Sequence, residues 1–240
     1  MITLSAPAKL ALSLAVVGVR ADGYHLIDAE MVSLDLADEL TFAHGDSLTV
    51  VDEVGRGAVV TSGEDNLVRR ALAATGRRAA VTLRKRIPAG GGLGGGSADA
   101  AAVLRWARCA DVGMAARLGA DVPFCVIGGR ARVRGVGEIL EALDAAPLVG
   151  QPFTLLTPPF GVSTLAVYKA WDSMGGPTGA LNDLEAAALQ VEPRLARWRD
   201  RLGDATGEVP VLAGSGSTWW VPGAHPGGAR IVARATGPLA

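Results

Sequence analysis

Between residues 88 and 99 the chain reads Pro-Ala-Gly-Gly-Gly-Leu-Gly-Gly-Gly-Ser-Ala-Asp. Six glycines in seven positions lose much conformational entropy on folding, so this segment must require a backbone without Cβ atoms. A strand pattern over residues 79–84 precedes the run, and apolar residues at helical spacing follow it, so a helix is expected to begin near Ser97. Backbone N–H groups at the start of such a helix converge on an anion. The run therefore predicts a phosphate-binding loop, with the Ser97 hydroxyl placed to meet a phosphate or its Mg²⁺.

Two plainer interpretations of the glycine run stay open at this point. It could be a flexible connection, or a tight strand-to-helix turn in which Ser97 is only the N-cap. Two better-known nucleotide motifs do not fit. No Lys-Ser or Lys-Thr pair follows the glycines as in a P-loop. The dinucleotide fingerprint needs an acidic residue about 20 positions further on at a strand end, where this sequence predicts helix and turn.

Composition excludes several classes of protein. The 240 residues are 49% hydrophobic and 20% charged, which is typical of a globular chain of one domain or two small ones. A net charge of −1 gives no basic surface for nucleic acid. The two cysteines form no CxxC pair, which fits a reducing compartment. The start lacks a signal-peptide pattern and no apolar run reaches about 18 residues, so we expect a cytoplasmic protein without membrane association.

The patterns along the chain mix strands and helices without strict alternation, which favours an α+β fold over a doubly wound sheet. Proline and glycine near residue 148 suggest a boundary between a domain at 1–148 and another at 149–240. Strands are expected at 9–17, 30–36, 40–43, 48–51, 58–61, 79–84, 125–127, 131–134, 139, 153–157, 209–212, 218–221 and 229–235. Helices are expected from 67, from 97, and at 114–118, 164–174, 181–189 and 193–202, the first capped by Asp65 or Asn66.

Lys9 and Asp121 are candidate catalytic residues. Lys9 interrupts an apolar strand, and a buried ammonium there would need an anionic partner, although a strand-end lysine reaching solvent fits the spacing equally well. Asp121 could simply cap a short turn that contains Pro123. Held near Lys9 and the glycine loop, its carboxylate could instead orient or deprotonate a substrate hydroxyl. The segment at residues 214–217, Gly-Ser-Gly-Ser, is a plain hairpin turn unless the second domain folds back over the first.

Three segments in this order resemble the motifs of the GHMP small-molecule kinases: Ala-Pro-Ala-Lys-Leu at 6–10, the glycine run, and Gly-Ser-Gly-Ser at 214–217. Within that superfamily the sequence is most similar to the kinases of 4-diphosphocytidyl-2-C-methyl-D-erythritol, which belong to the non-mevalonate isoprenoid pathway. The segments at 20–25, 119–124, 135–138 and 181–185 carry this likeness, and Asp-Gly-Tyr-His at 22–25 is its most specific part.

The resemblance implies an N-terminal domain like domain 2 of ribosomal protein S5 and a ferredoxin-like C-terminal domain, with the site between them. It further implies an enzyme that uses ATP and Mg²⁺ to phosphorylate the 2-hydroxyl of a small molecule carrying cytidine diphosphate, and we expect a monomer or homodimer. Lys9 and Asp121 match the catalytic pair, and Tyr24, His25 and Tyr168 match the cytosine-binding residues. The positions that match the ATP site are Asn66, Lys85, Pro88, Gly90, Gly91, Gly92, Leu93, Gly94, Gly95, Gly96 and Ser97.

The sequence departs from the family pattern at Ala11, where these kinases usually have asparagine. Positions 9 and 11 of a strand share one face about 6–7 Å apart, so the missing amide would border the active site. Two other functions therefore stay open. One is a GHMP kinase for another small alcohol, such as homoserine or a mevalonate derivative, which would have no base to bind at Tyr24. The other is a nucleotide-binding homologue that has lost its chemistry.

Overall fold

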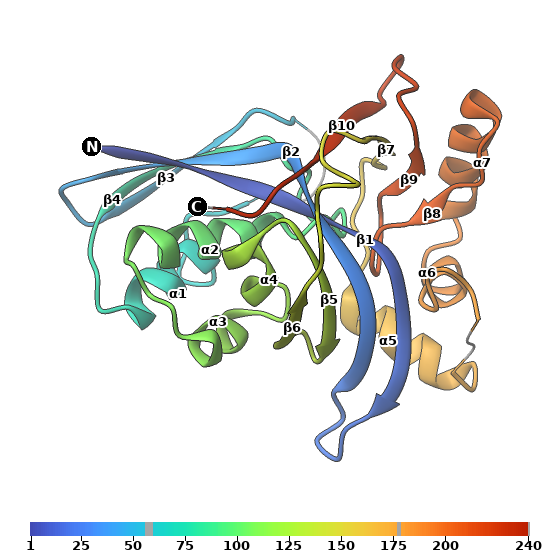
Figure 1. Ribbon diagram of the computed structural model, residues 1–240, viewed down its shortest axis with the longest axis horizontal. Helices are drawn as coiled ribbons and strands as arrows, with labels where there is room; N and C mark the ends of the chain where they lie inside the picture. Colours follow the sequence, from blue (N-terminus) through green and yellow to red (C-terminus); the bar gives the residue numbers. More distant parts are fainter. Residues whose placement is uncertain (56–59, 177–178, 240) are drawn as a thin grey trace.

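A long hairpin dominates the N-terminal part of the structure, a computed structural model that describes residues 1–55, 60–176 and 179–239 (Figure 1). Strand β1 (Ile2–Val19) pairs antiparallel with β2 (His25–Ala43) along nearly its whole length. The alternating pattern in β1 buries one set of apolar side chains, as expected for a strand of this period. The two short strands predicted at 30–36 and 40–43 are parts of the single strand β2.

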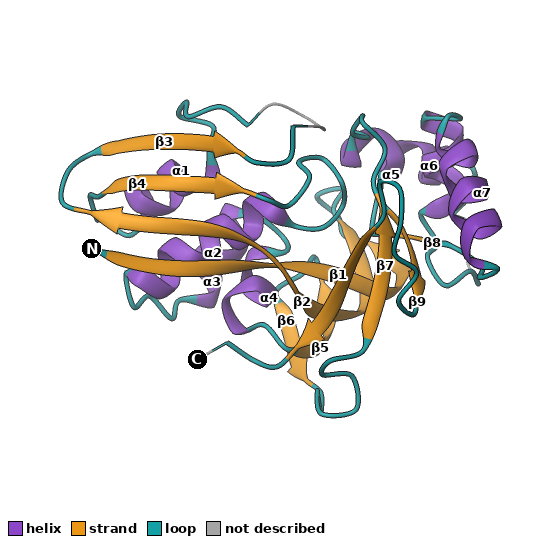
Figure 2. Ribbon diagram, turned by 90° about the horizontal axis from the view of Figure 1, so that it is seen from above, coloured by secondary structure: helices purple, strands orange, loops and turns teal. Residues whose placement is uncertain are grey.

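The N-terminal part is a sheet with helices packed against one face (Figures 1 and 2). In this sheet β2 pairs with β1, β4 and β5, while β3 runs parallel to β4 and β6 pairs with β5. The other strands are β3 (Ser47–Asp52), β4 (Ala80–Lys85), β5 (Arg130–Gly135) and β6 (Ile139–Ala142). The helices are α1 (Leu67–Ala74), α2 (Gly95–Trp106), α3 (Val112–Leu118) and α4 (Val122–Ile127). Helix α2 lies centrally and buries seven residues, six of them alanines or larger aliphatics.

The C-terminal part has its own strands, and they join the first sheet through β10. The strand order there is β10-β7-β9-β8, and β10 pairs with β2 at Ala235 and Thr236. The strands are β7 (Pro152–Leu156), β8 (Val211–Leu212), β9 (Trp219–Pro222) and β10 (Ile231–Thr236). The helices are α5 (Thr164–Ser173), α6 (Glu185–Val191) and α7 (Leu195–Thr206). Helices α6 and α7 lie at one end of the molecule, and α5 lies between them and the N-terminal part (Figure 2).

The tryptophan pair at 219–220 belongs to the interior. Trp219 is fully buried in the larger core cluster, and Trp220 packs edge-on against Phe153 in the smaller one. Successive residues of a strand point to opposite faces, so neighbouring tryptophans on β9 fill two different cores. The pair therefore has a packing role.

Several sequence-based expectations about elements need correction. The helix predicted at 181–189 begins only at Glu185. Residues 125–127 were predicted as a strand but lie in helix α4, where Pro123 occupies the first turn, a position that proline favours. Helix α2 begins at Gly95, two residues before the predicted start. Val60 and Thr61 lie in no strand, and the rest of the segment predicted at 58–61 is outside the described residues. The apolar run at 125–127 is too short for periodicity to distinguish helix from strand.

None of the helices within the described ranges combines the length and the apolar character needed to span a bilayer.

Candidate active site

The glycine loop connects β4 to α2 and leaves the start of that helix open. Gly94 is the N-cap residue, with a left-handed φ of 69°, and no side chain caps the helix. The first N–H groups of α2 are therefore not used by a side-chain cap, and the positive end of the helix dipole lies beside them. Ser97 is not the N-cap, which excludes the plainest interpretation of that residue. The geometry is that of an anion-binding helix start.

The loop between β8 and β9 packs directly onto the glycine loop. Thr218 N–H donates to the Gly91 carbonyl at 3.1 Å. A Cβ atom on Gly92 would lie 2.1 Å from the Ala213 carbonyl oxygen, so only glycine allows this approach. The second part of the chain thus folds back over the first, and Gly-Ser-Gly-Ser at 214–217 is more than a remote hairpin turn.

Asn182 holds the loop between β8 and β9, called the second loop below, in place. Its Nδ2 donates to the carbonyls of Leu212 at 2.8 Å and Gly214 at 2.7 Å, and its Oδ1 accepts from Leu184 N–H at 2.9 Å. Its neighbour Asp183 accepts from Val16 N–H on β1 at 2.9 Å. Sequence reasoning used the segment 181–185 only as a mark of resemblance and did not identify this function.

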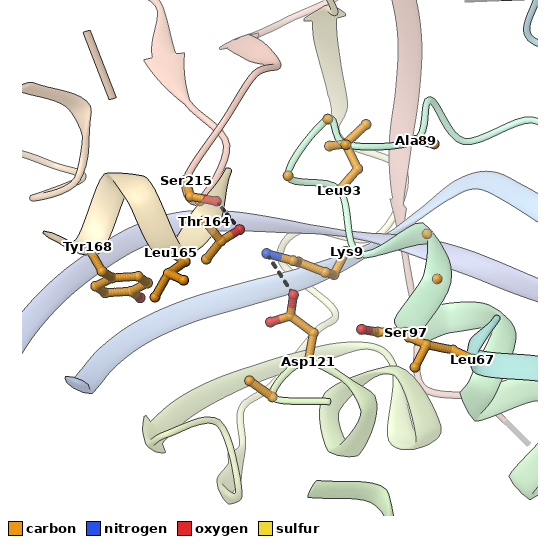
Figure 3. A pocket seen from close by; sticks show the side chains of 18 of the residues that line it. Lys9, Leu67, Ala89, Leu93, Ser97, Asp121, Thr164, Leu165, Tyr168 and Ser215 are labelled. Carbon is orange, nitrogen blue, oxygen red and sulfur yellow. Dashed lines mark hydrogen bonds and ion pairs between the residues drawn. The ribbon is translucent and has the colours of Figure 1, made fainter. Parts of the chain in front are cut away.

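Lys9 lies in the middle of the site, where β1 passes beneath both loops. Its backbone N–H donates to the Leu93 carbonyl at 3.0 Å, and its side chain passes so close to Gly94 that a Cβ there would lie 2.7 Å from Lys9 Cγ. The residue is only 5% exposed. Its ammonium Nζ is 3.3 Å from Asp121 Oδ2, and the two side chains point toward each other (Figure 3). The expected anionic partner is therefore present, and a solvated strand-end lysine is excluded.

Asp121 directly precedes helix α4 but does not cap it. Its carboxylate makes no capping hydrogen bond, and 29% of the side chain is exposed. The carboxylate faces Lys9 and the open cleft instead (Figure 3). A carboxylate in this position can accept hydrogen bonds from both the lysine ammonium and a ligand hydroxyl.

Lys85 lines the cleft, but its ammonium is engaged by two buried carboxylates. Nζ contacts Asp99 Oδ2 at 2.8 Å and also Asp38 Oδ2. Burial alone would lower the pKa of Lys85, but Asp99 and Asp38 outweigh it and the pKa is raised. Burial raises the pKa of Asp99 to about 7, although Lys85 counteracts the shift. The three residues tie β4, β2 and α2 together just behind the glycine loop.

Replacing Lys85 with methionine is expected to destabilise the fold by about 3–5 kcal/mol, because it leaves Asp38 and Asp99 buried without their cation. Lys169→Met on the exposed side of α5 is the matched control and should change the unfolding free energy by less than about 0.5 kcal/mol. Urea denaturation of the two variants measures both values. Equal stability of the variants would show that the triad does not hold these elements together.

Asn66 is placed at the edge of the same cleft and caps α1. Its Oδ1 accepts from Val68 N–H at 2.9 Å, and its Nδ2 donates to the Thr61 carbonyl at 2.7 Å. The predicted helix cap is confirmed, and Asn66 rather than Asp65 provides it.

An aromatic cluster forms the far end of the cleft. His25, the first residue of β2, lies with its ring centroid 4.6 Å from that of Tyr168 on α5. Burial raises the pKa of Tyr168. Tyr24 stands at the tip of the hairpin and is 62% exposed, with the Arg20 guanidinium 5.5 Å from its ring centroid. An exposed tyrosine beside a cleft leaves one ring face free for a flat ligand.

Ala11, where asparagine was expected, is buried in the larger core opposite Met31 on β2. Met31 itself lines the cleft. Positions 11 and 31 therefore place apolar side chains where the family pattern has an amide, while Ser33 lies opposite Lys9 on β2.

All predicted site residues line one cleft of about 1160 Å³. This exceeds the usual size of a single small-molecule site, so the cleft has room for two ligands. It also includes residues that sequence reasoning did not single out, among them Thr164, Ser215 and Asp172. The Thr164 and Ser215 hydroxyls hydrogen-bond at 2.9 Å near Lys9 and link α5 to the second loop (Figure 3).

Comparison with known proteins shows which family the chain belongs to. Residues 66–129 match the GHMP kinases N terminal domain. The 4-diphosphocytidyl-2-C-methyl-D-erythritol kinase of Paracoccus denitrificans is 42% identical over 234 residues, covering 89% of this chain and 84% of that protein. The chain belongs to the 4-diphosphocytidyl-2-C-methyl-D-erythritol kinase family. A crystal structure of a 4-(cytidine 5'-diphospho)-2C-methyl-D-erythritol kinase has a TM-score of 0.76 and 30% identity, covering 98% of this chain and 100% of that one.

Membership of the 4-diphosphocytidyl-2-C-methyl-D-erythritol kinase family confirms the resemblance, the α+β GHMP kinase fold and the prediction of an enzyme. A mevalonate kinase structure, at 10% identity and a TM-score of 0.60, shares the fold alone. The roles of individual residues in the cleft follow from their geometry and are proposed below.

Proposed function

We propose that this chain transfers the γ-phosphate of ATP to the 2-hydroxyl of 4-diphosphocytidyl-2-C-methyl-D-erythritol. The observation that carries the proposal is the order of groups along one cleft. The glycine loop lies at one end, the Lys9–Asp121 pair in the middle, and His25 with Tyr168 at the other. This order matches the parts of the two substrates: the phosphates of ATP, the acceptor hydroxyl, and the cytosine ring of the acceptor. The proposal includes a division of the chain into domains at 1–148 and 149–240.

The glycine loop would bind the phosphates of ATP. The uncapped start of α2 presents backbone N–H groups and a positive dipole end, both of which stabilise a phosphate. In phosphoryl transfer the protein contributes mainly positioning and charge stabilisation. Contact of the loop with residues 213–218 would fix its conformation before ATP arrives.

Asp121 and Lys9 would act on the acceptor hydroxyl. The hydroxyl oxygen forms a new bond to the γ-phosphorus, the bond from that phosphorus to the β,γ-bridging oxygen breaks, and ADP leaves. The hydroxyl proton passes to the Asp121 carboxylate, which is the part-exposed base of the pair. The buried Lys9 ammonium stabilises negative charge on the reacting oxygens, and its ion pair keeps Asp121 pointed at the same place.

Mg²⁺ fits the oxygen atoms that face the cleft. Ser97 lies in the first turn of α2, and the Asp121 carboxylate is part-exposed beside it (Figure 3). Magnesium in kinases is typically held by one or two protein oxygens together with phosphates and waters, so few protein ligands are needed. The Ser97 hydroxyl would hold the Mg²⁺ ion. When bound, the ion would neutralise charge on the phosphates.

Substitutions of Tyr24 test whether the end of the cleft formed by Tyr24, His25 and Tyr168 binds the cytosine ring; this is called the pyrimidine end below. Tyr24→Ala removes a stacking surface worth about 1–3 kcal/mol, so KM for the cytidyl substrate should rise about ten- to a hundredfold. Tyr24→Phe keeps the ring and should stay near the parent value. KM for ATP should not change in either variant, since the glycine loop is untouched. Steady-state ADP release with each substrate varied measures both constants, and an unchanged KM for the cytidyl substrate in Tyr24→Ala would contradict cytosine stacking.

A further inference from the structure

Helix α5 holds the His25 ring on three sides. His25 Nε2 is 2.8 Å from Asp172 Oδ1, the ring is tilted over Tyr168 at a centroid distance of 4.6 Å, and it meets Trp171 edge-on at 5.7 Å. The side chain of His25 is 12% exposed, whereas that of Asp172 is 48% exposed and lines the cleft. Histidine and aspartate lie 147 positions apart in sequence. The ring is therefore fixed by a helix from the other part of the chain.

The Asp172 contact also selects one form of the imidazole ring. An ionised carboxylate only accepts hydrogen bonds, so Nε2 must carry the hydrogen. In the neutral ring the other nitrogen, Nδ1, is then an acceptor. Nδ1 has no hydrogen-bond partner in the described part of the chain, and His25 lines the cleft. An acceptor at this place complements a ligand that presents an exocyclic amino group.

We propose that Asp172 is a positioning residue for the pyrimidine end of the cleft, which fixes the orientation and tautomer of His25 for the base of the acceptor substrate. This inference rests on the proposed function. Asp172 acts through His25 and takes no part in phosphate transfer. Its loss should therefore weaken binding of the cytidyl substrate and leave the ATP end of the cleft unaffected.

Two substitutions at position 172 separate positioning from simple damage. Asp172→Ala removes the acceptor, and KM for the cytidyl substrate should rise about tenfold with KM for ATP unchanged. Asp172→Asn keeps an acceptor oxygen and should restore most of the affinity. Asp204→Asn, an exposed aspartate of α7, is the matched control and should match the parent. Equal rises in both KM values, or no rise in Asp172→Ala, would overturn the proposal.

The tautomer of His25 provides a readout that a merely structural role would not move. The chain has three histidines, so ¹⁵N-edited NMR of the side chains is simple to assign with His25→Gln as reference. His25 should be the Nε2–H form in the parent protein, where Asp172 only accepts, and a mixture of forms in Asp172→Ala. An unchanged tautomer in Asp172→Ala would refute the inference even if KM changes. Absence of ADP release by the parent with the cytidyl substrate would instead refute the proposed function, and the positioning role with it.

Discussion

Replacing Asp121 by asparagine is expected to lower kcat by about 10³-fold, within the range for loss of a positioned general base. The asparagine side chain has nearly the same shape but cannot accept the hydroxyl proton. The fold should survive, because the carboxylate makes no capping bond to α4 and is 29% exposed. KM for ATP should change little, since the glycine loop does not depend on this residue.

Single-turnover phosphate transfer at saturating ATP measures this loss without interference from product release. Asp46→Asn, an exposed aspartate in the turn before β3, serves as the matched control and should retain the parent rate. Thermal unfolding of each variant establishes that the protein is folded. A folded Asp121→Asn variant with more than about a tenth of the parent rate would assign the reaction to Lys9 and the phosphate loop without a base.

Gly92→Ala is expected to destabilise the protein strongly. Gly92 has a φ of 75°, and its new Cβ would lie 2.1 Å from the Ala213 carbonyl oxygen and 2.9 Å from that of Gly216. Both neighbours are backbone atoms, so the contact between the two loops must open. Left-handed strain and overpacking together should destabilise the protein by about 2–5 kcal/mol.

The control for this substitution is Gly207→Ala at the end of α7. Gly207 has nearly the same φ, 73°, but a Cβ there meets nothing within 4 Å, so it reports backbone strain alone. Urea denaturation should place Gly92→Ala well below Gly207→Ala in stability. ATP affinity, measured by calorimetry, should fall only in Gly92→Ala. Equal behaviour of the two variants would contradict a tight contact between the loops.

Local patterns predicted the elements on which the site is built. The alternation in β1 placed Lys9 on a strand, and the glycine run between a strand and a helical pattern predicted the open start of α2. The capped helix after Asn66 was confirmed as well. These features depend on residues that are close together in the sequence, where the preferences of residues for helix, strand and turn are strongest.

Features that depend on distant residues could not be predicted in this way. Lys85 meets Asp38, 47 positions away, and His25 meets Asp172, 147 positions away. No periodicity in a single sequence relates such pairs. The sequence also did not predict helix α4 over residues 125–127, because a short apolar run after Pro123 is compatible with helix and strand alike. Asn182 was visible as part of a motif, but its bonds to Leu212 and Gly214 became evident only from the fold.

The most direct test of the proposed function is ADP release by the purified protein with ATP, Mg²⁺ and 4-diphosphocytidyl-2-C-methyl-D-erythritol, with homoserine and mevalonate as alternative acceptors. The cleft geometry predicts release that depends on the cytidyl substrate and is absent with the other two. Release with homoserine or mevalonate alone would contradict the pyrimidine end of the site. ATP binding without release for any acceptor would contradict the kinase reaction itself, and Ala11→Asn would then be the first variant to examine.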